Sequence, residues 1–301
     1  MKKILLYMMI VTITAALFFS CDGDKYETFV DQPGYSGNPT KVENLTGQAL
    51  PGEILLKWDV PADSSYYFVR IKYYDHYTKE EVTKIVSVYT DELLIPNTRK
   101  KYGDYEFKFQ AFNNKNEGGE VITFKTQSGI APTVETITTT KVALTVDQLS
   151  SNAAEPNEGP IKNLIDGNSD TFFHTRWSGG GQPWPHWLDV HLNEPVENFR
   201  FYYQNRSAAN QQSAPTDVDL YVSNDGSTWT FLEKLTTGLP LANKGEYTSN
   251  IYRVGTPFTY FRFSVNAAMR GTGSQSSWNM AEFAFYDVKI DVYDPEDPSN
   301  D

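Results

Sequence analysis

Apolar residues recur at every second position along most of this chain, and this pattern limits the chain to β-structure. Ile54, Leu56 and Trp58 alternate with polar residues, and the runs 67–73 and 105–111 do the same. Residues two apart lie on one face of a strand, so each run predicts a strand with one buried face. The runs are short, turn residues separate them, and no segment carries a convincing 3.6-residue apolar repeat. The sequence therefore predicts an all-β protein built from sandwiches.

The first residues follow a different pattern. Lys2 and Lys3 precede a predominantly apolar run over 4–19, which is the form of a secretory signal and too short for a lasting membrane span. Cys21 is the only cysteine, and an unpaired thiol in an exported protein needs an explanation. Residues 17–21 (LFFSC) resemble a bacterial lipobox, which implies cleavage of a signal peptide at 1–20 and lipid on Cys21. The alternative is an ordinary secreted protein with a stray cysteine.

Residues 21–40 are polar, contain Gly and Pro, and predict a flexible tether. Asp22 and Asp24 resemble the signal that sends lipoproteins of some glycan-degrading Gram-negative bacteria to the outer face of the outer membrane. The alternative is a solvated linker. The formal net charge of −12 disfavours nucleic acid as a partner, because an acidic surface repels phosphate backbones.

Two domains are predicted downstream. Residues 41–126 resemble a fibronectin type III domain in the segments 56–61 (LKWDVP), 94–98 (LIPNT) and 105–113 (YEFKFQAFN), which implies an immunoglobulin-like sandwich that commonly serves as a spacer. Residues 127–141 are Thr-rich and predict a linker to a domain over 142–292. Residues 293–301 are acidic, broken by Pro, and predicted to be a disordered tail.

The second domain resembles the discoidin, or coagulation factor type C, domains. Four motifs occur in the family's order: NLIDGNSDTFFHTRW at 163–177, PHWLDV at 185–190, YVSNDGSTW at 221–229 and AEFAFY at 281–286. The resemblance implies a jelly-roll β-sandwich with the topology of galactose-binding domains. The functional group that it most resembles is the family 32 carbohydrate-binding modules.

Acidic and amide side chains alternate in the tight loop at Asp166, Asn168 and Asp170. Calcium takes six to eight oxygen ligands of these kinds, and the loop is too short for an EF-hand, so a more distant acid must complete a site. The resemblance supplies that acid as Glu282. We expect a structural calcium ion held by Asp166, Asn168, Thr171 and Glu282, with backbone carbonyls near 163 and 281. The alternative is an Asx-type turn without metal.

Glycan sites combine flat rings, which cover the apolar face of a sugar, with charged or amide groups that bind its hydroxyls. Both chemistries occur in loops of the second domain, which predicts a ligand site formed by His174, Arg176, Trp177, Arg206 and Trp278. As alternatives, Trp177 plugs the end of the sandwich and Arg206 pairs with an acid. Trp187 and Trp229 lie in strand patterns and are expected in the core.

The chain lacks the motifs of a catalytic serine elbow, a zinc protease or a phosphate-binding loop, and its four histidines are not spaced as a zinc site. We expect no enzyme. The hypothesis is a lipid-anchored, cell-surface glycan-binding protein of the outer membrane, working within a glycan-uptake system beside an outer-membrane transporter. The alternative is an adhesin or scaffold that binds a protein partner, which predicts a larger exposed apolar patch.

Overall fold

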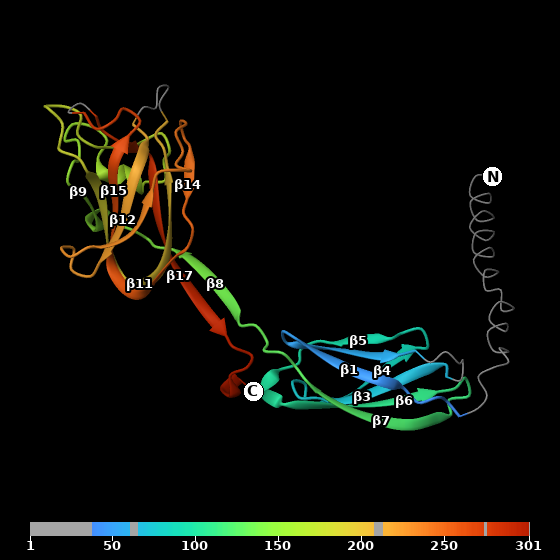
Figure 1. Ribbon diagram of the computed structural model, residues 1–301. Helices are drawn as coiled ribbons and strands as arrows, with labels where there is room; N and C mark the ends of the chain where they lie inside the picture. The colour runs from blue at the N-terminus through green and yellow to red at the C-terminus, as the bar shows by residue number, and fades with distance from the viewer. Residues whose placement is uncertain (1–37, 61–65, 208–212, 274–275, 301) are drawn as a thin grey trace, which may run out of the picture. The chain divides into compact units, whose positions relative to one another are not determined.

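The computed structural model describes residues 38–60, 66–207, 213–273 and 276–300 (Figure 1). The predicted signal peptide, Cys21 and most of the predicted tether lie outside these residues. The described part consists of strands and short 3-10 helices, which confirms the all-β prediction. None of its helices is long and apolar enough to cross a membrane. The chain divides into two compact units, one up to Val134 that also includes Tyr293 onward, and one over Glu135–Val292.

Two sheets form the first unit. Strands β1 (Glu43–Leu50), β2 (Glu53–Asp59) and β5 (Glu92–Ile95) make the order β1-β2-β5, and strands β4 (Glu80–Ser87), β3 (Phe68–Asp75), β6 (Asp104–Phe112) and β7 (Gly118–Gln127) make the order β4-β3-β6-β7. The alternating residues of the sequence are its core: Ile54, Leu56, Val69, Phe107 and Phe109 are all fully buried. Period-two burial on two sheets thus gives a β-sandwich.

A short 3-10 helix, η3 (Lys100–Tyr102), precedes β6 in this unit. The Tyr105 hydroxyl accepts the N–H of Arg99 at 2.8 Å and donates to the Arg99 carbonyl at 3.3 Å, which fixes the turn before β6. The fibronectin type III assignment itself stays a prediction.

The predicted disordered tail is wrong for residues 293–300. The Glu296 carboxylate accepts the backbone N–H groups of Lys100 at 3.0 Å, Lys101 at 2.8 Å and Ala131 at 2.7 Å, and η6 (Pro298–Asn300) follows it. The segment belongs to the first unit, although it follows the second in sequence. The acidic, Pro-containing composition indicated disorder. Composition alone cannot show that one carboxylate accepts hydrogen bonds from three main-chain N–H groups.

One large sheet dominates the second unit. Its order is β13-β12-β15-β11-β17-β8, and β9 and β14 also pair with β11. A separate pair joins β10 to β16, and the short helices η4 (Val146–Gln148) and η5 (Ile161–Leu164) lie in the connections. The strands are β8 (Val134–Lys141), β9 (Leu149–Ser151), β10 (Phe173–His174), β11 (His186–Gln204), β12 (Pro215–Ser223), β13 (Thr230–Leu235), β14 (Glu246–Thr248), β15 (Tyr252–Ala268), β16 (Asn279–Met280) and β17 (Glu282–Tyr293). Strand β8 lies inside the segment 127–141, which the sequence assigns to a linker.

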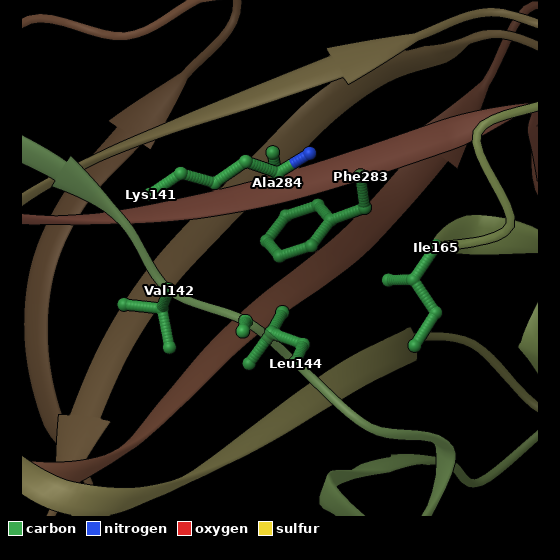
Figure 2. A pocket seen from close by; sticks show the side chains of 7 residues that line it. Lys141, Val142, Leu144, Ile165, Phe283 and Ala284 are labelled. Carbon is green, nitrogen blue, oxygen red and sulfur yellow. The ribbon is translucent and has the colours of Figure 1, made fainter.

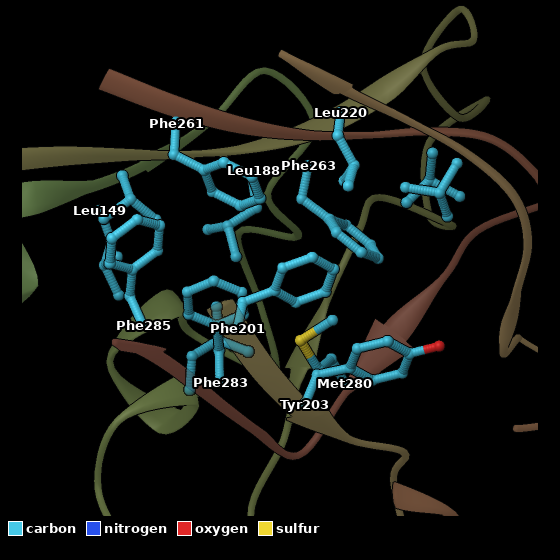
Figure 3. Packing of buried hydrophobic residues seen from close by; sticks show 14 of the residues in the cluster. Leu149, Leu188, Phe201, Tyr203, Leu220, Phe261, Phe263, Met280, Phe283 and Phe285 are labelled. Carbon is cyan, nitrogen blue, oxygen red and sulfur yellow. The ribbon is translucent and has the colours of Figure 1, made fainter. Parts of the chain in front are cut away.

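Aromatic side chains fill the core of this unit (Figure 3). Phe201 on β11, Phe261 and Phe263 on β15, and Phe283 and Phe285 on β17 pack together with Leu188 and Leu220 around them. Such rings bury large apolar areas, and burial of apolar area is the main stabilising term of the fold.

Trp187 and Trp229 are not in this core, contrary to expectation. Both remain partly exposed: Trp187 alternates out of phase with the buried residues of β11, and Trp229 lies in the turn before β13. They flank the Arg262 guanidinium, whose central carbon lies 4.3 Å from the Trp187 ring and 3.9 Å from the Trp229 ring. Asp189 binds Arg262 through two hydrogen bonds of 2.7 and 2.8 Å. These residues form a stacked ion pair on the outer face of the sheet.

Candidate functional site

Strand β10 positions the centre of the predicted glycan site. Its two residues pair with β16, and the N–H of His174 donates to the Gly159 carbonyl at 3.0 Å. Gly159 has a φ of +62°, and a Cβ there would lie 2.7 Å from the His174 nitrogen. Only glycine allows both this backbone conformation and this close approach.

His174 is 6% exposed, and its ring is held in one tautomer. Its Nδ1 lies 2.6 Å from the Thr175 carbonyl, which can only accept, so Nδ1 carries the proton. Burial lowers the pKa of His174, so the ring is neutral at physiological pH and Nε2 is an acceptor. A neutral imidazole of this tautomer can accept a hydrogen bond from a hydroxyl group.

Glu155 organises the loop that carries Trp177. Its carboxylate accepts the N–H groups of Trp177 and Ser178, each at 3.2 Å, and the Ser178 hydroxyl at 2.9 Å. Burial acts to raise the pKa of Glu155, but these hydrogen bonds outweigh it and the pKa lies below its usual range. Glu155 is only 4% exposed and therefore acts as a support for the loop.

Trp177 itself is 45% exposed, and its indole N–H donates to Glu158 at 2.9 Å. The ring is thus oriented by one hydrogen bond while much of its surface faces solvent. It does not plug the end of the sandwich, because a plug would be buried.

Arg206 follows β11 and lies against Phe172. Its guanidinium carbon is 3.4 Å from the centroid of the Phe172 ring, which is a cation–π contact. Burial lowers the pKa of Arg206, and the charge of Glu158 opposes this effect. The charges of Glu158 and Arg206 also act on His174, so these groups surround one place on the domain.

Arg176 lies in the same loop as Trp177. Its Nε donates to the Ser178 carbonyl at 3.3 Å, which holds the guanidinium against its own loop. Gly179, Gly180 and Gly181 follow, with φ values of +64°, +99° and +68°, and close the loop in a conformation that favours glycine.

The prediction for Trp278 as a sugar-stacking ring is wrong. Its side chain is fully buried and contacts the rings of Phe173 at 5.3 Å and Phe263 at 6.1 Å. Its backbone carbonyl accepts the N–H of Thr175 at 2.9 Å. Trp278 is a core residue that braces the strand carrying His174. Polar neighbours such as Ser276, Ser277 and Asn279 suggested a loop, but they are buried too.

Sequence reasoning missed three contributors: Phe172, Glu155 and Glu158. Phe172 stood inside the quoted motif as one of two adjacent rings, and alternation alone does not show which one faces outward. The two glutamates lie in an irregular stretch, 154–159 (AEPNEG), where no periodicity marks a position as important. Only the folded chain brings this stretch beside β10.

The predicted calcium ligands do come together. Thr171 donates its hydroxyl to Asp166 at 2.8 Å, and the N–H of Asn168 donates to the same carboxylate at 2.9 Å. Glu282 lies against Asp166: burial, the charge of Asp166 and a hydrogen bond between the two carboxyls raise the pKa of Glu282 to about 7. The Glu282 Oε1 atom is buried and has no hydrogen-bond partner among the described residues.

Two carboxyls in contact, with one oxygen left unpaired, are compatible with a bound cation, while the bond from the Asn168 N–H to Asp166 is also that of an Asx-type turn. Within the described residues, no group of three or more His, Cys, Asp or Glu side chains is arranged to hold a metal. Any further ligands here must therefore be amide, hydroxyl or backbone oxygens, which calcium accepts.

A cavity of about 320 Å³ is lined in part by Ile165 and Phe283, the sequence neighbours of Asp166 and Glu282 (Figure 2). Val142, Leu144, Ile165 and Phe283 line it, and Lys141 stands at its margin. The lining is mostly aliphatic and offers few hydroxyl-binding groups. Its chemistry does not suit a sugar.

Comparisons with known proteins concern the second unit above all. Residues 147–283 match the family model described as F5/8 type C domain, and this domain carries the site described above. A sialidase of Micromonospora viridifaciens is 31% identical over 113 residues, which are 36% of this chain and 17% of the sialidase. The chain thus spans less than a fifth of that relative.

Several solved structures are also similar. The CBM32-5 module from Clostridium perfringens in complex with GalNAc-β-1,3-galactose is 23% identical, covering 46% of this chain and 92% of the module, with a TM-score of 0.38. A family 32 module of the same organism in complex with galactose is 18% identical, covering 50% of this chain and all of the module, with a TM-score of 0.38. A SusE-like protein is 15% identical, covering 85% and 99% of the two chains, with a TM-score of 0.34.

Proposed function

We propose that this protein is a non-catalytic glycan-binding protein whose F5/8 type C domain holds the ligand at Trp177. The observation that carries the proposal is the exposed Trp177 ring, fixed by Glu158 in a site that also contains Arg206 and His174. The ring covers an apolar sugar face, while the guanidinium and imidazole bind hydroxyl groups.

The same geometry favours a glycan over a protein partner. The alternative of a protein partner predicts a larger exposed apolar patch, whereas the large exposed ring here is a single tryptophan among polar and charged groups. Carbohydrate chemistry matches that mixture. The adhesin alternative rests on no specific observation of this site.

Calcium belongs to the proposal as a structural ion. Asp166, Asn168, Thr171 and Glu282 would hold it, and when bound it would offset the repulsion between the two carboxylates. The ion would stabilise the loop before β10 and take no part in ligand chemistry.

The cellular setting is part of the same proposal. The signal-like residues 1–20 and the lipobox-like segment ending at Cys21 support export and lipid anchoring at the outer membrane, with the binding domain at the cell surface. A non-catalytic glycan binder in that place would serve a glycan-uptake system beside an outer-membrane transporter.

A glycan array probed with residues 22–301 tests this function, followed by calorimetry with the strongest ligand. Trp177→Ala and Arg206→Ala should each weaken binding about tenfold to a hundredfold, since a stacked ring or a charged hydrogen bond contributes about 1.5–3 kcal/mol. Phe231→Ala is the matched control, because Phe231 is an exposed ring on β13 outside the site. An array without any bound glycan, or variants that bind as well as the parent, would contradict the proposal.

A further inference from the structure

Strand β8 is an unprotected edge of the large sheet. It stands at the end of the strand order, with β17 as its neighbour, and every residue of Val134–Lys141 is exposed (Figure 1). Proteins usually blunt such edges with proline, bulges, short strands or several lysines. β8 has eight residues, no proline and a single lysine at its end, and Ile137 is 45% exposed.

The direction of the backbone groups shows which edge is open. The N–H of Val142, just after β8, donates to the Phe285 carbonyl of β17 at 2.9 Å. Successive N–H groups of a strand point to opposite edges, so those of Ile137, Thr139 and Lys141 point away from β17. They form a row of main-chain donors and acceptors ready to pair with another strand.

We propose that this edge pairs antiparallel with β8 of a second copy of the chain, centred on Thr138. In that register Glu135 lies opposite Lys141 of the second copy, and Lys141 opposite Glu135, so both ends of the pairing carry opposite charges. Ile137 lies opposite Thr139 on the same face, and β-branched residues suit such cross-strand pairs. The sequence ETITTTK is thus complementary to itself.

The surrounding charges are compatible with this pairing. Arg253 binds Glu135 through two hydrogen bonds of 2.7 and 2.6 Å, and the charges of Lys141 and Glu282 act on each other. Each end of the paired strands would therefore bring together two cations, Arg253 and Lys141, and two acids, Glu135 and Glu282.

Cysteine cross-linking tests the register directly. In residues 22–301, which lack Cys21, Thr138→Cys introduces the only thiol. Residue 138 would face its own copy with Cα atoms about 4.5 Å apart, which a disulfide spans, so oxidation should give a covalent dimer. Thr136→Cys is the matched control: its copy would lie four residues along, about 13 Å away, and should not cross-link.

Light scattering after gel filtration tests the association without a cross-link. The parent should show the mass of a dimer at high concentration, Thr139→Pro should be monomeric because it removes an N–H from the open edge, and Thr139→Val should still dimerise. A parent that is monomeric at all concentrations, or equal cross-linking of the two cysteine variants, would overturn the pairing. So would a dimer that survives Thr139→Pro.

Discussion

Replacing Glu296 by glutamine tests whether the C-terminal segment is a structural part of the first domain. The carboxylate accepts three backbone N–H groups at 2.7–3.0 Å, from Lys100, Lys101 and Ala131. A hydrogen bond to a charged group contributes about 1.5–3 kcal/mol when buried, but Glu296 is partly exposed and glutamine keeps one acceptor, so we expect a net loss of roughly 2–4 kcal/mol.

The pKa of Glu296 determines how this loss of stability changes with pH. Burial acts to raise the pKa of Glu296, but the N–H groups of Ala131, Lys100 and Lys101 outweigh it and the pKa is lowered. A carboxyl with a lowered folded-state pKa stabilises the fold above its unfolded-state pKa, and the contribution is lost as the pH falls through the folded value. The difference between the parent and Glu296→Gln should therefore be full at pH 7 and shrink below about pH 4.

Hydrogen exchange measures the effect at the three amides, and urea unfolding measures the whole domain. The amides of Lys100, Lys101 and Ala131 should exchange faster in Glu296→Gln, whereas Glu120→Gln, an exposed acid on β7, should leave them unchanged. Equal exchange in Glu296→Gln and the parent, or a stability difference that does not depend on pH, would refute the reasoning.

Three further outcomes are expected. Calcium at about 100-fold over its dissociation constant should stabilise the second domain by about 2.7 kcal/mol, and Asp166→Ala should abolish this effect. Calcium should bind more tightly above pH 7 than below it, because Glu282 must lose its proton. Melting curves that change with neither calcium nor EDTA would contradict the prediction. Trp278→Ala should cost about 3–5 kcal/mol in urea unfolding, as for a buried core ring, and a loss of glycan affinity at unchanged stability would restore it to the binding site. Cys21→Ala should move the protein out of the membrane fraction in detergent phase partitioning or leave an uncleaved precursor, and an unchanged fraction would rule out lipid anchoring.

The strands could be predicted from the sequence because burial in a sandwich follows the two-residue period. Ile54, Leu56 and Trp58 were marked by alternation and are buried. The same rule misassigned Trp187 and Trp229, since a strand pattern shows that two faces differ but not that an outward ring is supported by an arginine. A local sequence pattern cannot show which residues contact each other across the sheet.

In the candidate site too, the sequence could indicate some residues and not others. Asp166 and Glu282 lie more than a hundred residues apart, and only the family resemblance connected them before the structure placed them in contact. Trp177 was expected to be exposed because an aromatic residue in a polar loop has no core to fill, and its ring is exposed. Trp278 looked similar, but its side chain is buried in the core, and no local pattern marks the supporting Glu158.

The indole resonances of the six tryptophans test the central claim most directly. In a ¹H–¹⁵N spectrum of residues 22–301, Trp177→Phe identifies the Trp177 signal, which reports on the bond from its indole N–H to Glu158. Titration with a glycan from the array should shift the Trp177 signal most and leave those of the buried Trp58 and Trp278 in place. A bound glycan that shifts other indoles while the Trp177 signal stays unchanged would show that the site lies elsewhere.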